Sequence, residues 1–465
     1  MNIIYKIKSL IPKKLFKALQ PLYHFIFAWF SACLYKFPSD DLIVIGVTGT
    51  TGKTTSVYLM AEMLNKAGIK TGYTSTAMFN DGEKEWLNDK KMTMLGRFFT
   101  QKIMKTMVRN NCKVAIIETT SEGVRQFRHK FINYDVLVFT GLYPEHIESH
   151  GSFENYKKAK GKLFEHLKKC SYKYMDEERK IKKTETEIKK TDLNKIKKTI
   201  IINGDDEHAS YFLNFWADEK IVYSALEKNI LEQVQDDTNY KIIKYKNIKL
   251  TEKGISFDLD QEKIELKLLG EFNALNAMNA ISVGISLNMD LKTIKNNLEN
   301  ISGVPGRLEK IDEGQNFCVI VDYAFEPGAV KKLYETIKNI PHNKVIHVLG
   351  STGGGRDIAR RPELGRLAGE NTDFVIVTNE DPYDEDPEII IDQVALGAER
   401  AEKKEGQNLF KILDRREAIK KAISLAHEKD LVLITGKGSE QAICVAQGEK
   451  VEWDDREVVR ELLKK

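Results

Sequence analysis

The chain has few cysteines and no cysteine pair. Its five cysteines among 465 residues, Cys33, Cys112, Cys170, Cys318 and Cys444, lie far apart, with no Cys-x-x-Cys spacing. This spacing argues against a zinc ribbon and against a disulfide framework, and it fits a reduced cytosol. The net charge of +4 is small for this length, so the charge balance gives no argument for a nucleic-acid partner.

The chain also lacks a long hydrophobic run. The most apolar stretch, residues 21–35, follows five lysines and is rich in aromatic side chains. Its apolar part is about 14 residues long, shorter than the roughly 20 needed to span a bilayer. Ser31-Ala32-Cys33 imitates a signal-peptide cleavage site, but the nucleotide motif that follows argues against export. Two alternatives stay open for residues 1–38: a helix on the membrane surface of a cytoplasmic protein, or a helix packed on its body.

A phosphate-binding motif occupies residues 46–55, which read Gly-Val-Thr-Gly-Thr-Thr-Gly-Lys-Thr-Thr after the apolar run 42–45. A buried strand, a glycine turn and a helix start place backbone N–H groups and the helix dipole around phosphate oxygens. Lys53 would reach the β/γ-phosphates and Thr54 would ligate Mg²⁺. The predicted ATP-binding residues are Gly49, Thr50, Thr51, Gly52, Lys53, Thr54 and Thr55.

Apolar runs alternate with helical patterns along the rest of the chain, which predicts an α/β fold with mostly parallel sheets. We expect an N-terminal basic and aromatic helical segment over residues 1–38, a central ATP-binding domain over 39–302, and a C-terminal Rossmann-like α/β domain over 303–465. Residues 168–198 are rich in Lys, Glu and Thr and are expected to form a solvated insertion.

Acidic and histidine side chains follow two of the predicted strands. Glu118 ends the run 114–117, and a carboxylate at that place is expected to bind Mg²⁺ beside the phosphate loop. The run 136–139 is followed by Glu145-His146-Ile147-Glu148-Ser149-His150. Two histidines and two acids within six residues suggest metal or phosphate chemistry.

The motif Gly-Thr-x-Gly-Lys-Thr-Thr resembles that of the Mur ligases, ATP-driven amino-acid ligases of cell-wall synthesis. In that family an Asp-His-x-Asp-x-His-Gly segment precedes Tyr-x-x-Ala-Lys, whose lysine is carbamylated and binds Mg²⁺. The resemblance implies that His146 is the metal-binding histidine and that Lys160 is the carbamylated lysine, so that both are catalytic together with Lys53. Glu145 and Glu148 stand where the family has aspartates.

Further segments resemble the family in the same order. Gly270–Ala277 resembles a Gly-x-Phe-Asn-x-x-Asn-Ala segment, which implies that Asn273 lies near the adenine. Val304-Pro305-Gly306-Arg307 and the segment around Asp322 resemble family motifs that touch ATP, which assigns Arg307 and Asp322 to the nucleotide. Phe325 replaces a usual histidine.

Three C-terminal segments, residues 353–362, 378–387 and 436–440, resemble the tripeptide-synthetase branch of the family, where they hold the incoming amino acid. The implied substrate residues are Ser121, Arg356, Asp381, Tyr383, Gly436 and Glu440. The family's N-terminal domain, about a hundred residues that grip uridine diphosphate, has no counterpart because residues 1–41 are too short to build it.

The resemblance implies an ADP-forming ligase that uses ATP and Mg²⁺ to join an amino acid to a muramoyl-peptide carboxylate through an acyl-phosphate. Members that add meso-diaminopimelate carry Asp-Asn-Pro-Arg, in which the arginine clamps the second carboxylate. Glu380-Asp381-Pro382-Tyr383 stands here instead. An acidic neighbourhood without that arginine favours a side-chain ammonium, so we expect L-lysine or a similar diamine.

Three alternatives compete with this interpretation. One is a folylpolyglutamate synthetase, which usually has Gly-Lys-Gly-Ser where this chain has Gly-Lys-Thr-Thr. Another is the ligase that amidates a lipid-linked precursor, although that enzyme carries a four-cysteine zinc insertion. The third is a membrane-tethered nucleotide-binding protein without ligase activity, which would not need Lys160.

Overall fold

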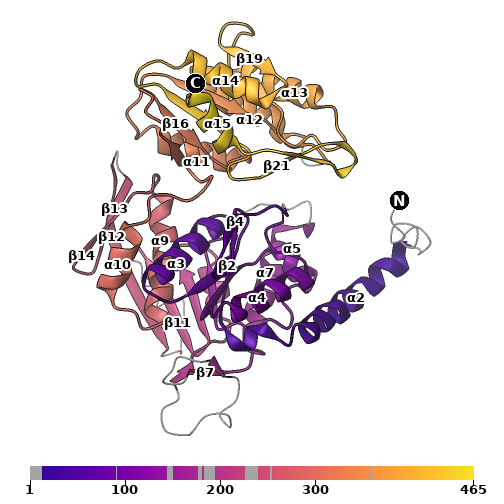
Figure 1. The fold of residues 1–465 in the computed structure, drawn as a ribbon, viewed down its shortest axis with the longest axis vertical. Coiled ribbons are helices and arrows are strands. Elements are labelled where there is room, and N and C mark those ends of the chain that lie inside the picture. The colour runs from indigo at the N-terminus through magenta and orange to yellow at the C-terminus, as the bar shows by residue number, and fades with distance from the viewer. Residues whose placement is uncertain are drawn as a thin grey trace.

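The computed structural model describes residues 13–90, 92–143, 150–175, 181–182, 194–225, 239–251, 254–355 and 358–464. Each of two units is built around a sheet, and the C-terminal unit lies above the central unit in Figure 1. Among these described residues, no helix is both long and apolar enough to cross a bilayer.

The central unit contains a sheet that, over the described residues, has eleven strands in the order β14-β13-β12-β11-β10-β6-β1-β5-β2-β3-β4. Its strands are β1 (Ile43–Thr48), β2 (Thr71–Thr74), β3 (Met78–Asn80), β4 (Glu85–Leu87), β5 (Val114–Glu118), β6 (Val136–Phe139), β10 (Thr199–Asn203), β11 (Glu219–Ser224), β12 (Tyr240–Thr251), β13 (Gly254–Leu259) and β14 (Glu262–Leu266). The middle of the sheet is parallel, and antiparallel strands extend both edges.

Helices cover both faces of this sheet because side chains along each buried strand alternate between the faces. Ile43 and Ile45 of β1 face the core under α3 (Lys53–Lys66), α9 (Phe272–Ser286) and α10 (Leu291–Glu299). Val44 faces the opposite core. That second face is covered by α4 (Arg97–Arg109), α5 (Ser121–Arg125), α7 (Phe153–Leu167) and α8 (Ala209–Leu213). The phosphate loop therefore follows a strand, β1, whose two faces are both packed against helices.

The C-terminal unit has a six-stranded sheet over the described residues, in the order β15-β16-β20-β17-β18-β19. Its strands are β15 (Glu309–Ile311), β16 (Cys318–Val321), β17 (Val345–Leu349), β18 (Phe374–Thr378), β19 (Leu409–Ile412) and β20 (Leu431–Ile434). The helices are α11 (Pro327–Ile337), α12 (Arg360–Asn371), α13 (Pro387–Arg400), α14 (Arg415–Leu425) and α15 (Asp455–Leu463), and a hairpin joins β21 (Ala442–Cys444) to β22 (Lys450–Glu452). Within the six-stranded sheet, every strand pair except β15 with β16 is parallel.

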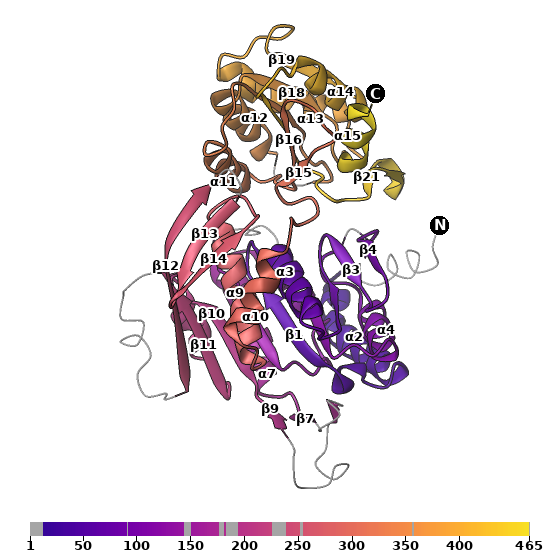
Figure 2. The same cartoon turned by 60° about the vertical axis from the view of Figure 1, so that its left-hand side comes forward.

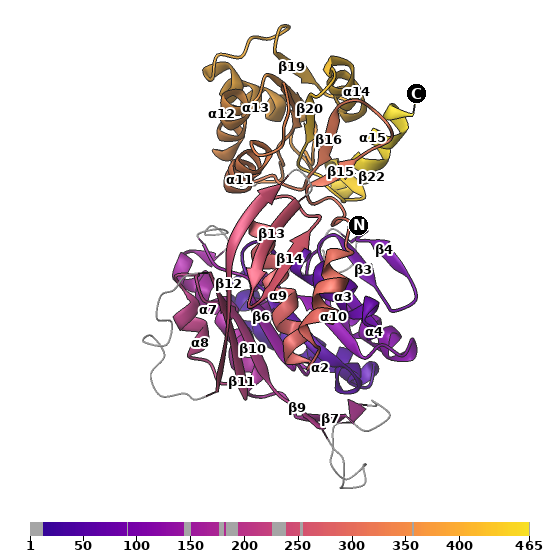
Figure 3. The same ribbon diagram turned by 90° about the vertical axis from the view of Figure 1, so that its left-hand side faces the viewer.

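The two units touch where β6 ends. The amine of Lys332, on α11, lies 5.1 Å from the ring centre of Tyr143, in the loop after β6. Phe272, at the start of α9, packs against the C-terminal core. Figures 2 and 3 show β12 and β13 rising from the central sheet toward α11. The carboxyl edge of the central sheet therefore faces the second unit.

The predicted fold class is confirmed: the predicted apolar runs 114–117 and 136–139 lie within strands, and the run 42–45 overlaps β1 from Ile43 on. The prediction of a solvated insertion over 168–198 is wrong at its two ends. Lys173, in β7 (Lys173–Met175), and Lys198 are fully buried, and their amines both bind the carboxylate of Asp135. These amines also donate to backbone carbonyls, so the lysines are part of the core despite the polar composition. The strands β8 (Ile181–Lys182) and β9 (Asn194–Ile196) pair with β7.

The helix α2 (Lys13–Leu34) lies within the predicted N-terminal segment and packs on α4. It is followed by the short 3-10 helix η1 (Pro38–Asp41). A second 3-10 turn, η4 (Ala446–Gly448), lies in the C-terminal hairpin.

Candidate functional site

The phosphate loop joins β1 to α3 in very little space. Gly52 is the N-cap of α3 and has φ 79°, a left-handed conformation that glycine adopts without strain. A Cβ atom at Gly52 would lie 2.5 Å from Oδ1 of Asn276, and one at Gly49 would lie 2.0 Å from Oγ1 of Thr140. The glycines are therefore required for the close approach of this loop to α9 and to the end of β6.

Lys53 folds back over this loop. Its Nζ donates to the backbone oxygens of Gly49, at 3.1 Å, and Thr50, at 2.6 Å. Among the described residues no carboxylate forms an ion pair with Lys53. The amine can leave these neutral carbonyls for a phosphate oxygen without breaking an ion pair.

Glu118 lies at the end of β5, beside the loop, and is 1% exposed. Its Oε2 accepts from Oγ1 of Thr54 at 3.0 Å and from the backbone N of Thr76 at 2.8 Å, and its Oε1 accepts from Oγ1 of Thr76 at 3.0 Å. The predicted residues Thr54 and Glu118 are therefore in direct contact. Thr76 was missed by sequence reasoning, although it follows β2, the strand next to β5.

Lys160 reaches the same loop from α7. It is 2% exposed, and its Nζ donates to the backbone oxygen of Gly49 at 2.7 Å. Tyr156, one turn earlier, has its ring centre 4.5 Å from that amine and its hydroxyl 3.3 Å from Oγ1 of Thr50. The Tyr-x-x-Ala-Lys motif therefore packs onto the phosphate loop.

His146, the predicted metal-binding histidine, lies outside the described residues. Ser121, at the start of α5, contacts Nε2 of His150 through its hydroxyl at 3.0 Å. Over the part of the chain that is described, no three His, Cys, Asp or Glu side chains form a group that could hold a metal ion.

An asparagine network connects α9 to the phosphate-loop helix. Asn276 accepts from Oγ of Ser56 at 3.3 Å and donates to Oδ1 of Asn273 at 2.7 Å. Asn273 in turn donates to the backbone oxygen of Leu269 at 2.7 Å and is 5% exposed. Asn273, predicted near the adenine, is therefore one hydrogen bond from the residue that contacts Gly52.

Arg307 and Asp322 lie together at the start of the C-terminal unit. The guanidinium of Arg307 lies 4.1 Å from the ring centre of Tyr323. The carboxylate of Asp322 accepts from the backbone N of Leu308 and of Ala324, both at 2.7 Å. Burial raises the pKa of Asp322, and Arg307 partly offsets this. The charge pair that the sequence assigned to the nucleotide is thus assembled next to the junction of the two units.

A second cluster lies beyond the carboxyl ends of β18 and β20. Lys437 is fully buried, and its Nζ donates to Oδ1 of Asp381 at 3.0 Å and to Oε2 of Glu440 at 2.6 Å. Oδ1 of Asp381 also accepts from the backbone N of Cys444 at 2.6 Å. Asp381 and Glu440 were predicted, whereas Lys437, which holds them together, was missed because a lysine in a loop usually indicates a solvated surface.

Glu380 is a third residue, after Thr76 and Lys437, that the sequence did not single out. It is 3% exposed, and its Oε1 accepts from Oγ1 of Thr352 at 2.8 Å. Its Oε2 has no hydrogen-bond partner among the described residues. A Cβ atom at Gly436 would lie 2.5 Å from that oxygen, which explains the glycine. Burial, with the charge of Asp381 next, raises the pKa of Glu380.

The surrounding charged residues are largely paired. Tyr383 has φ 51°, and its backbone N donates to the backbone oxygen of Cys444 at 3.1 Å. Arg361 is buried and forms an ion pair of 2.7 Å with Glu385, and Arg360 forms one of 2.6 Å with Glu326. Arg356 lies outside the described residues. Of the acids that the sequence groups here, Asp381 is thus paired with Lys437 and Glu385 with Arg361.

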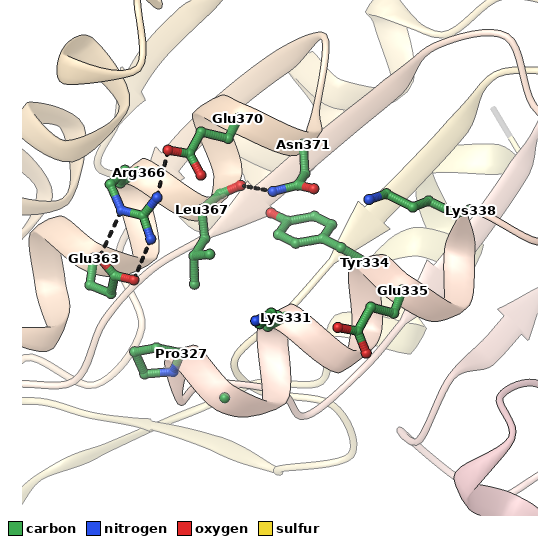
Figure 4. A pocket seen from close by; sticks show the side chains of 11 residues that line it. Pro327, Lys331, Tyr334, Glu335, Lys338, Glu363, Arg366, Leu367, Glu370 and Asn371 are labelled. Atoms are coloured by element: carbon green, nitrogen blue, oxygen red, sulfur yellow. Dashed lines mark hydrogen bonds and ion pairs between the residues drawn. The ribbon is translucent and has the colours of Figure 1, made fainter.

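A surface groove of about 470 Å³ lies between α11 and α12, away from the predicted site residues. Figure 4 shows Arg366 in this groove between Glu363 and Glu370, to which it is bound. Because these three charges are paired with one another, we assign no ligand to the groove.

Comparison with known proteins identifies the same two units. The Mur ligase middle domain matches residues 47–198 and 174–284, and the Mur ligase glutamate ligase domain matches residues 306–438. The UDP-N-acetylmuramyl-tripeptide synthetase of Roseiflexus sp. (strain RS-1) is 33% identical over 441 residues, which are 93% of this chain and 81% of that protein. The UDP-N-acetylmuramoyl-L-alanyl-D-glutamate--2,6-diaminopimelate ligase of Geobacillus thermodenitrificans is 33% identical over 436 residues, covering 92% and 80%.

Solved structures agree with this match. A UDP-N-acetylmuramoyl-L-alanyl-D-glutamate--2,6-diaminopimelate ligase superposes with a TM-score of 0.57 and 26% identity, covering 91% of this chain and 78% of that one. Folylpolyglutamate synthase of Mycobacterium tuberculosis, at 16% identity and a TM-score of 0.60 over 88% of this chain and 91% of that one, shares the fold. The phosphate loop, the lysine that reaches it from α7 and these matches together show that the chain belongs to the Mur ligase family of ATP-dependent ligases, which join an acid to an amino acid.

Proposed function

We propose that this enzyme adds an amino acid to the free carboxylate of a muramoyl peptide, in the synthesis of peptidoglycan precursors. The observation that carries the proposal is the buried contact between Nζ of Lys160 and the backbone oxygen of Gly49, at 2.7 Å. A phosphate loop alone serves many nucleotide-binding proteins. A buried lysine on that loop, in addition to the partly buried Lys53, fits a ligase that must organise more charge than Lys53 neutralises, and the relatives that match over nine-tenths of the chain are named for this reaction.

The chemistry proceeds in two steps whose atoms balance. A carboxylate oxygen of the donor attacks the γ-phosphorus, the bond from that phosphorus to the β,γ-bridging oxygen breaks, and ADP leaves. The amine of the amino acid then attacks the acyl carbon, phosphate leaves with the carboxylate oxygen, and the nitrogen loses a proton. Lys53 lies on the phosphate loop, where its amine can bind the γ-phosphate as negative charge develops on it. This interaction stabilises the transition state more than the ground state.

Mg²⁺ would be held by Thr54, Glu118, His146 and a carbamylated Lys160. The residues present fit a hard cation, because Thr54 and Glu118 bring oxygen atoms together at the loop. Carbamylation of Lys160 would add two oxygens while keeping one N–H for the carbonyl of Gly49. When bound, the metal would neutralise phosphate charge.

We propose L-lysine or a similar diamine as the added amino acid. Tyr383 offers no bidentate partner for a second substrate carboxylate, and Oε2 of Glu380 is a buried acceptor without a hydrogen bond from the described residues. An ammonium would satisfy that oxygen, whereas a carboxylate would be repelled by it. The ion pairs of Asp381 and Glu385 leave Glu380 as the acid that favours this choice.

The test is phosphate release from ATP with a UDP-linked muramoyl dipeptide as donor, screened across amino acids. We expect release to require both donor and amino acid, with kcat/KM for L-lysine more than about tenfold above that for meso-diaminopimelate. A preference for meso-diaminopimelate would overturn the choice of amino acid. Phosphate release only with a lipid-linked muramoyl peptide would show that the donor is lipid-linked rather than UDP-linked. Release with folate and glutamate would favour the folylpolyglutamate alternative. If no donor acid gave amino-acid-dependent release, a nucleotide-binding protein without ligase activity would be favoured.

A further inference from the structure

The helix α2 concentrates the exposed apolar surface of this protein. Among the described residues, sixteen large hydrophobic side chains are exposed, and nine of them belong to this one helix. Leu22, Trp29 and Phe30 are 56%, 50% and 52% exposed. A helix that is apolar over most of its circumference is normally buried, so this surface needs a partner.

One narrow face of α2 is fixed to the central unit. Ala28, Ser31 and Ala32, which recur at helical spacing, are buried, and α2 packs on α4. Phe27 and Phe30 touch the ring of Phe98 only at the border of that contact, with ring centres 6.3 and 6.1 Å apart. Figure 1 shows α2 leaving the body along its axis, with its N-terminal part beyond the rest of the unit. The wide apolar face therefore remains open to solvent.

The charge around this helix has one sign. Residues 1–38 contain no Asp or Glu, although the whole chain has 68 acids against 72 basic residues. The lysines of that stretch are Lys6, Lys8, Lys13, Lys14, Lys17 and Lys36. The helix α4 beneath it likewise carries four basic residues and no acid. A second copy of this chain would bring two such positive segments together, so charge complementarity favours an anionic partner over self-association.

We propose that α2 lies in the interface of an anionic bilayer, with Leu22, Trp29 and Phe30 inserted among the lipid headgroups. Aromatic rings suit the interface, lysines at the N-terminal end suit acidic headgroups, and among the described residues no helix is both long and apolar enough to cross the bilayer. This inference is independent of which amino acid the enzyme adds. It would hold the ligase at the membrane surface.

Vesicle flotation tests the proposal with the full chain. We expect co-flotation with vesicles of mixed phosphatidylglycerol and phosphatidylcholine, at least about tenfold more than with phosphatidylcholine alone, and a decrease as salt rises. The double variant Trp29→Glu with Phe30→Glu should lose it. The matched control, Ile389→Glu with Leu396→Glu, places the same charges on exposed apolar positions of α13 and should float like the wild type.

Circular dichroism and phosphate release without vesicles check that both variants are folded, and they keep this test separate from that of ligase activity. Equal flotation of the α2 variant and the wild type would overturn the proposal, as would equal binding to neutral and anionic vesicles. A wild-type dimer by light scattering that the α2 variant abolishes, without flotation of either, would assign the face to a second copy instead.

Discussion

The two ends of the site leave opposite charges available. At the phosphate loop Lys53 rests on neutral carbonyls, and Glu118 accepts three hydrogen bonds from neutral donors. In the C-terminal unit the lysine is saturated, because Lys437 binds two carboxylates, while Glu380 keeps one bare oxygen. We therefore expect the first end to accept an anion such as a phosphate, and the second to accept a cation such as an ammonium.

The largest effect should come from removing the saturated lysine. Lys437→Met leaves the buried carboxylate of Asp381 and the partly buried carboxylate of Glu440 without their cation, and breaking a buried pair costs about 3–5 kcal/mol. We expect the free energy of unfolding in urea to fall by that amount. Lys53→Met is the matched substitution and should change stability by less than about 1 kcal/mol. If both variants lost the same free energy of unfolding, Lys437 would not stabilise the fold more than Lys53 does, which would contradict this prediction.

Lys53→Met should instead remove catalysis. Without this amine the negative charge on the γ-phosphate has no lysine partner at the loop, so phosphate release should fall about 10²- to 10³-fold. The control is Lys66→Met, at the exposed end of the same helix, which should retain full activity. Wild-type turnover of the Lys53 variant would show that the loop does not bind the γ-phosphate.

Lys160→Ala should lower phosphate release at least about 10²-fold without unfolding the protein. Short carboxylic acids added to the assay should restore part of this activity, because they can occupy the position of the carbamate oxygens. Lys158→Ala, on the exposed side of α7, serves as the control. Full activity of the Lys160 variant would show that Lys160 is only a structural lysine. The same would follow if short acids never rescued the variant and mass spectrometry found no carbamate on the wild-type protein.

Glu380→Gln sharpens the comparison at the other end and should have the smallest effect. The amide keeps the shape but not the charge, so KM for the amino acid should rise about 10-fold, the worth of a charged hydrogen bond. The KM for ATP should not change. Because burial raises the pKa of Glu380, the wild-type KM for the amino acid should also rise as the pH falls through that pKa, and this dependence should vanish in the variant. Asp384→Asn, on the exposed neighbouring loop, should leave both values unaltered.

The central fold could be predicted because strands buried on both faces read as continuous apolar runs, and the phosphate loop has a fixed spacing. The contact of Thr54 with Glu118 followed from those two facts. The contact of Lys160 with the loop came from a motif, since its burial has no signal in composition. Thr76 was missed because β2 has only four residues and weak apolar character.

The buried charges of the C-terminal unit and of residues 168–198 were hardest to predict. Lys437, Lys173 and Lys198 look like surface lysines in the sequence, and each is buried only because acids or carbonyls from distant segments surround it. Such pairing depends on which strand ends lie next to each other in the fold. The spacing of residues along one segment does not predict this. The edge strands β12 to β14 were missed for a related reason, since β12 alternates between buried and exposed side chains and carries many lysines.

In the proposed reaction the two ends act together: the carboxylate of the donor is activated at the phosphate loop and then meets the amine of the amino acid. Oxygen-18 in the free carboxylate of the muramoyl donor tests it most directly. Attack on the γ-phosphorus carries one labelled oxygen into the phosphate, so the account predicts that the phosphate released in the presence of the amino acid contains one oxygen-18 atom and that the amide product has lost one. Unlabelled phosphate would contradict it, because ATP would then be hydrolysed by water.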